Sequence, residues 1–365
     1  MHIPDGYLSP HTCVAAYAVA VPAWSVASRK VGEVVTTRNV PVLAVFSALS
    51  FLIMMFNIPI PDGTSAHAVG AVIIAIVLGP WAAVLAVSVA LLFQALLFGD
   101  GGVLAYGANA VNMAVVMPFA GWWTYRALAA GSALTSRRRT LAAGLGGYVG
   151  INAAALAAAV EFGIQPELFH SDDGTPLYCP YDLGTTLPAM ALPHLTLAGA
   201  AEAILTAGVL AYLARTDAQL LAPSHPGVPL RQGQGQEPVT AGARRRSPGR
   251  IALGVMAVLV VLSPLGLLAP GGAFGEDAPE DLDLADLGLR AVPEGLDRFN
   301  GFWGHTLLTD YGFADGGHAP AAYCLSAVLG IAVVGAAVLA VGRLLEALTG
   351  RGAPGPGGPR RSPAR

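Results

Sequence analysis

The sequence predicts an all-α integral membrane protein of about nine transmembrane helices, a seven-helix bundle followed by a two-helix hairpin module. Hydrophobic residues make up 54% of its 365 residues and charged residues 12%, and the mean hydropathy is +0.59. A soluble domain of this size does not bury so large an apolar fraction. Apolar runs near the bilayer-spanning length of about 20 residues recur along the chain, and Lys and Arg gather in alternate connections between them.

Nine apolar segments are expected to be helices: 12–28, 40–58, 66–79, 81–98, 103–125, 140–162, 188–213, 251–269 and 321–342. The third is short, and the Gly79-Pro80 pair that follows it is typical of a tight turn. A single helix over 66–98 would move the basic run at 137–139 to the outer side, so we expect a cytoplasmic turn there. A partly re-entrant third segment in a locally thinned bilayer is the alternative.

Charge distribution predicts the orientation. With the N-terminus outside and the C-terminus cytoplasmic, the cytoplasmic segments carry all Lys and Arg residues except Arg290 and Arg298. Most acidic residues gather on the outer side, in 161–182 and 276–315. Residues 1–11 contain no basic residue of the kind that opens a signal peptide. We therefore expect a multi-pass protein of the cell membrane whose mature chain begins at Met1.

A change of composition divides the chain. Residues 214–250 are rich in Pro, Gly, Gln and Arg, which predicts a flexible cytoplasmic linker. Before it, 1–213 forms the seven-helix module, and after it 251–347 forms a helical hairpin around an acidic outer loop. Residues 348–365 are mostly Pro, Gly and Arg, a composition that predicts a disordered tail.

A histidine at position 2 is chemically special, because the amine of Met1, the backbone nitrogen of His2 and its imidazole can chelate one metal ion. Strong in-plane nitrogen donors suit tetragonal sites of Ni(II) and Cu(II). The fourth donor is expected from His67, at the outer start of the third predicted helix and thus on the same side as His2. The alternative for His2 alone is a solvated side chain near a terminus.

Other polar residues of the first module are candidates for supporting roles. His11 either supports the ligands or merely begins the first helix. Asn109 and Asn112 share a helical face and would hydrogen-bond a ligating imidazole or the N-terminal segment, or else another helix. Glu202 is an acid within a membrane helix, which is functional by default but can also be neutral and packed. A disulfide among the three cysteines is weakly supported, because their number is odd and no CxxC pattern occurs.

Four stretches carry a family resemblance: MHIPDGYLSP at the N-terminus, HAVGAVIIAIVLGPWAA from His67, GANAVNM from Gly107 and PHLTLAGAAEA from Pro193. They resemble the CbiM/NikM family, the metal-binding S-components of energy-coupling factor (ECF) transporters for cobalt and nickel. The resemblance covers 1–213 and implies that the terminal amine, His2 and His67 hold the metal. The stretch VPEGLDRF at 292–299 is similar to the PDGLE-type NikN/CbiN subunit, although the motif here reads PEGLD. That implies a role in metal loading, with Glu294 and Asp297 as candidates.

The sequence lacks a nucleotide-binding GxxxxGK[ST] loop, so the energy for transport is expected from partners. The resemblance implies a CbiQ/NikQ-like transmembrane T-component and a CbiO/NikO-like pair of cytoplasmic ATPases. Ni(II) or Co(II) is then the transported substrate, with no organic cofactor, no enzymatic activity and no nucleic-acid partner. An ATPase-independent permease and a membrane metal sensor remain alternatives. An intramembrane metalloenzyme is disfavoured because no HExxH motif occurs. Both metals accept the same nitrogen donors, so the sequence does not choose between them.

Overall fold

Helices account for nearly all regular structure in the computed structural model, which describes residues 1–34, 40–60, 65–230, 248–269 and 273–349. The α-helices are α1 Pro10–Val34, α2 Val40–Met54, α3 Ala71–Leu78, α4 Pro80–Phe93, α5 Tyr106–Asn109, α6 Met117–Ala129, α7 Arg137–Gly163, α8 Gln165–Leu168, α9 Leu183–Pro193, α10 Gly199–Thr216, α11 Pro248–Leu262, α12 Glu294–Phe299 and α13 Ala319–Thr349. Short 3-10 turns are η5 Ala218–Leu221, η6 Ser263–Leu268, η7 Pro279–Asp281 and η8 Thr309–Tyr311. Two short strands, β1 Ile58–Pro59 and β2 Ser65–Ala66, pair antiparallel.

Three π-helical segments extend or join these helices. They are η2 Gln94–Phe98 after α4, η3 Ala110–Val116 between α5 and α6, and η4 His194–Ala198 between α9 and α10. Among the described residues, four helices are long and apolar enough to cross a membrane: Pro80–Phe98, Arg137–Leu168, Leu183–Thr216 and Ala319–Leu344. Val40–Met54 and Leu253–Leu268 are shorter apolar helices. A mostly helical membrane protein is therefore confirmed.

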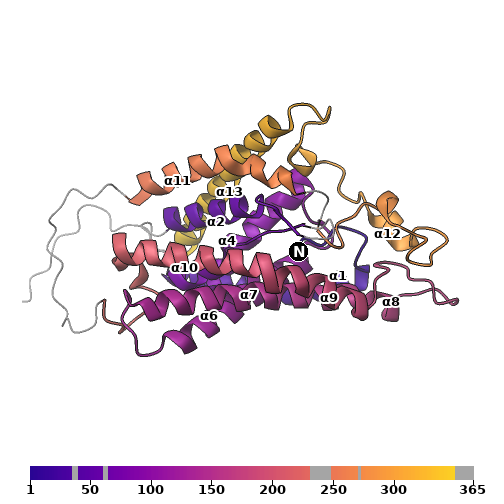
Figure 1. The fold of residues 1–365 in the computed structure, drawn as a ribbon. Helices are drawn as coiled ribbons and strands as arrows, with labels where there is room; N and C mark the ends of the chain where they lie inside the picture. Colours follow the sequence, from indigo (N-terminus) through magenta and orange to yellow (C-terminus); the bar gives the residue numbers. More distant parts are fainter. Residues whose placement is uncertain (35–39, 61–64, 231–247, 270–272, 350–365) are drawn as a thin grey trace, which may run out of the picture.

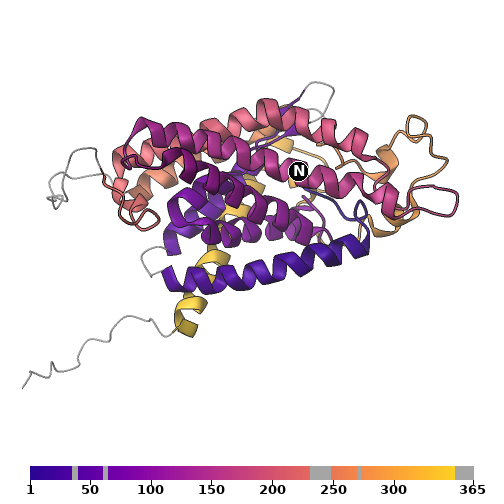
Figure 2. The same ribbon diagram turned by 90° about the horizontal axis from the view of Figure 1, so that it is seen from below.

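The outer surface of the helices is apolar where a bilayer would contact it. Leu141 on α7, Ile204 on α10 and Val261 on α11 are each at least 70% exposed. Figure 2 shows α1 lying along the outside of the bundle, and Val14 on this helix is 68% exposed. Large exposed apolar side chains on several long helices suit contact with lipid rather than water.

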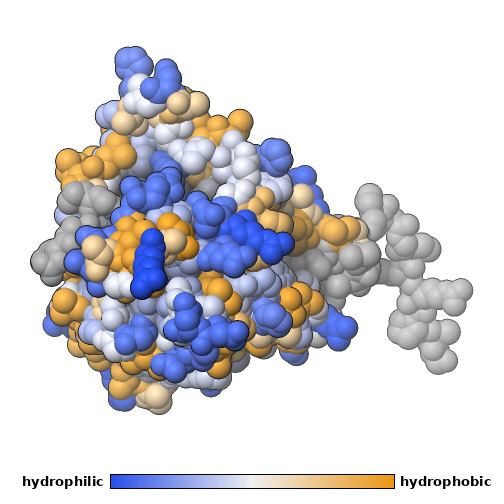
Figure 3. Space-filling view, turned by 90° about the vertical axis from the view of Figure 1, so that its right-hand side faces the viewer, coloured by the Kyte–Doolittle hydropathy of each residue, from blue (hydrophilic) through white to orange (hydrophobic). Residues whose placement is uncertain are grey.

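The two ends of the bundle differ. Figure 1 shows α8 and α12 together at one end, while α7 begins and α10 ends at the other. The first end carries the acidic segments, and many hydrophilic residues face the viewer there in Figure 3. The second end carries Arg137, Arg138, Arg139 and Arg215. The charges thus separate along the helix axes in the way that the sequence predicts.

The third predicted helix, 66–79, is wrong over its first part. α3 covers only Ala71–Leu78, because Gly70 before it adopts a left-handed φ of 76° and β2 holds residues 65–66 in an extended hairpin. Eight residues at about 1.5 Å each span roughly 12 Å, well short of a hydrocarbon core of about 30 Å. The break after α3 is where we predicted it, since Gly79 has a φ of 93° and α4 begins at Pro80.

The far end of α3 packs against the chain that follows α10. This end of α3 receives hydrogen bonds from Ser224 Oγ, which lies beyond α10, to the carbonyls of Val77 at 2.6 Å and Ile76 at 3.2 Å. Residues 65–77 are buried throughout. Such irregular backbone is tolerated at membrane depth when protein surrounds it.

The C-terminal half of the chain, as we call residues 251–347, packs directly on the first seven predicted helices. α13 contacts α2, α4 and α1. The hydroxyl of Tyr323 on α13 donates to the carbonyl of Met55 at 2.7 Å, and the Leu307 amide donates to the carbonyl of Leu97 at 2.8 Å. The helix α10 continues to Thr216, three residues into the predicted linker, and α13 continues to Thr349.

Parts of some predictions fall outside the described residues. They include the basic run at 244–246 within the predicted linker and nearly all of the predicted disordered tail, 350–365. Cys13, Cys179 and Cys324 are described, and all three are free thiols.

Candidate metal centre

The N-terminal segment, residues 1–9, lies inside the protein. Met1 and His2 are each 3% exposed, and Ile3 is fully buried. A terminus is usually mobile unless specific contacts hold it. The contacts made by residues 3, 5 and 6 therefore explain how His2 comes to have a defined position.

Asp5 and Asn109 hold this segment against the loop after η2. The Asp5 carboxylate accepts from the amides of Val103 at 3.0 Å, Leu104 at 2.8 Å and Ala105 at 3.1 Å. Asn109 pairs with the backbone of Ile3: its Oδ1 accepts from the Ile3 amide at 2.8 Å, and its Nδ2 donates to the Ile3 carbonyl at 3.0 Å. Both the backbone amide and the backbone carbonyl of the residue next to His2 are thereby fixed.

The helix α12 covers the segment from the C-terminal half of the chain. Gly6 adopts a φ of 93°, and a Cβ atom there would lie 2.6 Å from the carbonyl oxygen of Leu296 on α12. Only glycine combines this backbone conformation with so close an approach. The PEGLD stretch therefore packs over the N-terminus, while its candidates Glu294 and Asp297 are themselves exposed.

His67 follows β2, and hydrogen bonds fix both its ring and the backbone directly after it. Its Nδ1 lies 3.1 Å from the carbonyl oxygen of Ala68, so Nδ1 donates and Nε2 keeps its lone pair. Just beyond it, Glu202 of α10 accepts from the amides of Val69 at 2.8 Å and Gly70 at 3.0 Å. The intramembrane acid thus satisfies the two amides directly before α3 and fixes the segment that carries His67.

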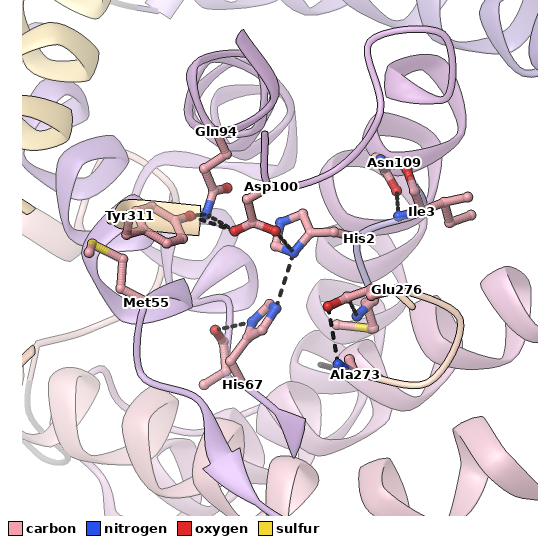
Figure 4. A network of polar contacts seen from close by, with 12 residues as sticks. His2, Ile3, Met55, His67, Gln94, Asp100, Asn109, Ala273, Glu276 and Tyr311 are labelled. Carbon is pink, nitrogen blue, oxygen red and sulfur yellow. Dashed lines mark hydrogen bonds and ion pairs between the residues drawn. The ribbon is translucent and has the colours of Figure 1, made fainter. Parts of the chain in front are cut away.

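The two histidines that the sequence selects lie side by side. His67 Nε2 is 3.3 Å from His2 Nδ1, and the two rings stack with centroids 5.0 Å apart. Figure 4 shows these nitrogen atoms facing each other. The amine of Met1, one residue away from His2, is buried in the same place.

Two carboxylates that the sequence analysis missed flank these nitrogens. Asp100 Oδ1 is 3.0 Å from His2 Nδ1, and Glu276 Oε1 is 3.2 Å from the N-terminal ammonium of Met1. Glu276 comes from the acidic loop of the C-terminal half. Asp100 gives a faint signal, a lone acid between glycines directly after an apolar segment. Glu276 gives none, because nothing distinguishes it from its acidic neighbours.

Burial and charge keep both imidazoles neutral. Desolvation, together with the positive N-terminal amine, lowers the pKa of His2 to about 4. Desolvation, the neighbouring His2 and the amine lower the pKa of His67 to about 3. Both rings therefore offer lone pairs at neutral pH.

The two carboxylates respond oppositely to the same surroundings. Desolvation and the charge of Glu276 raise the pKa of Asp100 to about 6. Burial also raises the pKa of Glu276, but the amine and the two histidines more than offset this, and its pKa is lowered overall. Glu276 is consequently the charged partner of the ammonium.

Among the described residues, the remaining sequence candidates make no hydrogen bond to His2, His67 or the terminal amine. His11 is exposed and its ring stacks on Phe169. Asn112 points away, since its Nδ2 donates to Glu161 Oε2 at 2.6 Å. Asn109 is the last residue of α5, whereas Asn112 lies within the π-helical η3, so the two do not share an α-helical face. His194 is buried and donates through Nδ1 to the Met190 carbonyl at 2.7 Å.

The chemistry of this group is unusual. Within the described residues, no three His, Cys, Asp or Glu side chains converge to hold a metal ion. Residues 2–220 match the CbiM family, described as "Cobalt uptake substrate-specific transmembrane region". The chain belongs to the CbiM family.

Members of other species extend the match beyond the CbiM region. The chain is 48% identical to the fused nickel transport protein NikMN of Rhodobacter capsulatus, over 96% of this chain and 99% of that one. It is 44% identical to the probable fused nickel transport protein LarMN of Lactiplantibacillus plantarum, over 91% and 95%. The crystal structure of a truncated transition metal transporter has 53% identity and a TM-score of 0.56, covering 59% of this chain and 99% of that one. This CbiM-family chain is thus a multi-pass membrane transport protein and not an enzyme.

Proposed function

We propose that the chain is the substrate-specific component of an ATP-driven ECF-type importer, which captures Ni(II) or Co(II) outside the cell and delivers it inward. Membership in the CbiM family and the likeness to a fused nickel transport protein support transport of these metals. The likeness to that fused protein covers 96% of the chain and so extends well into residues 251–347, which supports their assignment as a NikN/CbiN-like module.

In this proposal the metal ion has four nitrogen ligands. They are the amine of Met1, the backbone nitrogen and Nδ1 of His2, and Nε2 of His67. The observation that carries it is the 3.3 Å separation between His2 Nδ1 and His67 Nε2. Adjacent ligands of a planar site with metal–nitrogen bonds of about 2.0 Å lie about 2.8 Å apart, so a shift of roughly half an ångström brings these two imidazole nitrogens to ligand spacing.

Capture requires two contacts to open. The ammonium of Met1 must lose a proton and separate from Glu276, and Nδ1 of His2 must leave Asp100. Both carboxylates lie beside the nitrogens that they release, where their charge attracts a divalent cation before the nitrogens bind it. A chelate that also needs a deprotonated backbone amide favours metals with strong tetragonal nitrogen binding.

Topology and partners complete the proposal. The acidic end of the bundle faces outward and the Arg-rich end faces the cytoplasm, with the N-terminus outside and the C-terminus inside. Residues 1–213 are the metal-binding module, 214–250 a linker and 251–347 the hairpin module. A CbiQ/NikQ-like T-component and a CbiO/NikO-like ATPase pair supply the energy. Metal uptake measured with and without those ATPases distinguishes this importer from a self-sufficient permease or a sensor.

The test of the site moves the amine. A chain with two glycines added before Met1 keeps both imidazoles but places the amine beyond reach of the chelate. A single added residue is not used, because it would put this histidine third, where the amine, two backbone nitrogens and the imidazole still form a planar Ni(II) chelate. We expect that purified variant to lose high-affinity Ni(II) binding and the visible absorption of a planar Ni(II)–nitrogen site, as His67→Ala does. Two glycines added after Arg365 give the matched control, which should bind as the unmodified chain does. Unchanged affinity and spectrum in the N-terminal extension would show that the amine is not a ligand.

A further inference from the structure

A cluster of three side chains lies behind His2, on the side away from His67. Gln94 Nε2 donates to Asp100 Oδ2 at 3.3 Å and to the Tyr311 hydroxyl at 3.1 Å. The Tyr311 hydroxyl donates to the same Asp100 oxygen at 2.5 Å. Figure 4 shows Gln94, Asp100 and Tyr311 gathered around one edge of the His2 ring.

The partners of Gln94 fix which way its amide points. A carboxylate oxygen only accepts hydrogen bonds, so the group facing Asp100 must be the NH₂ of Gln94. The amide oxygen is then left on the other side. Within the described residues Gln94 Oε1 is buried without a hydrogen-bond partner, and Gln94 as a whole is fully buried. Such an orphaned acceptor is costly unless a donor reaches it in another state.

A matching orphaned atom belongs to His2. Its Nδ1 is engaged by Asp100 and His67, whereas its Nε2 is buried with no partner among the described residues. Gln94 and His2 meet at one carboxylate, because Gln94 Nε2 and His2 Nδ1 both contact Asp100. The unsatisfied acceptor and the unsatisfied ring nitrogen therefore belong to side chains that share this partner.

Tyr311 reaches this cluster through strained backbone. It has a φ of 62° and the preceding Asp310 a φ of 49°, a left-handed conformation that non-glycine residues rarely adopt. Strain of this kind persists where the surroundings demand it and is concentrated at functional sites. Here it brings a hydroxyl from the C-terminal half to both Asp100 and Gln94.

We propose that Gln94 is a positioning residue that selects the metal-binding tautomer of His2, and that Tyr311 holds Gln94 in the orientation this requires. Without metal, Nδ1–H of His2 donates to Asp100. With metal bound, Nδ1 gives its lone pair to the ion, and the ring proton resides on Nε2 and donates to Gln94 Oε1. The imidazole is neutral in both states, and Asp100 keeps the hydrogen bonds from Tyr311 and Gln94. This inference rests on the proposed function, because it assigns Nδ1 to the metal.

The experiment compares two variants of the full-length chain with a matched control. Gln94→Leu removes the acceptor, and Tyr311→Phe removes the hydroxyl that orients it. Tyr323→Phe is the control, because the Tyr323 hydroxyl belongs to the same half of the chain but donates to the Met55 carbonyl. Each protein, labelled with nitrogen-15 in histidine, is titrated with Ni(II), and the two ring nitrogens of His2 are followed by NMR.

We expect Gln94→Leu to bind Ni(II) roughly 10- to 100-fold more weakly, the usual effect of losing a partner behind a ligating imidazole. Tyr311→Phe should lose less of its affinity for Ni(II), and Tyr323→Phe should lose none. In metal-free Gln94→Leu the Nδ1–H signal of His2 should persist. In Ni(II)-bound Gln94→Leu the Nε2–H signal of His2 should shift, because its acceptor is gone. If Gln94→Leu does not fold, the Nε2–H signal of His2 in Ni(II)-bound Tyr311→Phe tests the proposal instead.

The outcomes separate the two proposals. If the unmodified chain binds Ni(II) and both variants match it in affinity and in the Nε2–H signal, Gln94 has no such role. If the unmodified chain shows no change at His2 Nδ1 with Ni(II), the proposed metal site itself is wrong. A weaker variant with an unchanged Nε2–H signal would mean that Gln94 only packs against the site, which also overturns the inference.

Discussion

The pairing of Asn109 with the backbone of Ile3 predicts a measurable loss of metal affinity in Asn109→Ala. The Ile3 carbonyl would keep the hydrogen bond from the Gly102 amide at 2.8 Å, but the Ile3 amide would have no acceptor. A buried amide left unpaired costs about 1–3 kcal/mol. The N-terminal segment would then leave its position in the free protein, and metal binding would have to restore it. At tenfold per about 1.4 kcal/mol, the affinity for Ni(II) falls roughly 5- to 140-fold.

Calorimetric titration of the purified chain with Ni(II) measures this loss, with circular dichroism to verify the helical fold. Asn112→Ala is the matched control, since Asn112 lies three residues further along and contacts Glu161 instead of the N-terminal segment. Its affinity should equal that of the unmodified chain. The reasoning fails if folded Asn109→Ala binds as tightly as Asn112→Ala, because the position of His2 would then not depend on this pairing.

Further predictions concern protons, packing and the His67 segment. Near neutral pH, binding of one Ni(II) should release two protons, one from the ammonium of Met1 and one from the His2 amide. Both imidazoles are already neutral and release none. The affinity for Ni(II) should therefore rise with pH. Titration in buffers of different ionisation enthalpy counts them, and a single proton would exclude the amide as a ligand. Gly102→Ala should weaken Ni(II) binding, because a Cβ atom there would lie 2.5 Å from the backbone nitrogen of Asp5. Gly208→Ala is the matched control, because nothing lies within 4 Å of a Cβ atom there and neither glycine has a left-handed φ. Glu202→Leu leaves two amides after His67 unpaired at about 1–3 kcal/mol each, so it should lower thermal stability and affinity more than Glu202→Gln does; equal effects of the two substitutions would contradict this role.

Sequence reasoning reached the parts of the fold and site that depend on local chemistry. Helix positions follow from apolar runs, and the break at Gly79-Pro80 follows from backbone preference. His2 was selected because its chelating ability needs only the residue before it. His67 was selected by its side of the membrane, although its expected place at a helix start was wrong. The left-handed Gly70 and the hairpin at 58–66 decide that place, and short strands leave little periodic signal.

The parts that sequence reasoning missed depend on contacts between distant segments. Glu276 meets Met1 across 275 residues, and Tyr311 meets Asp100 across 211. No spacing rule connects such positions. The helical face shared by Asn109 and Asn112 was predicted from α-helical geometry, yet the π-helical turn at η3 sends the two side chains to different partners.

The contact between Glu276 and the terminal amine joins two groups that lie far apart in the sequence of one chain. Because both groups belong to one polypeptide, their encounter is intramolecular, with an effective concentration on the order of millimolar even for a flexible tether. Separate subunits would have to reach that level in the plane of the membrane to keep the amine paired. Carrying both groups on one chain makes their pairing independent of expression level, so every copy has its own carboxylate for the amine.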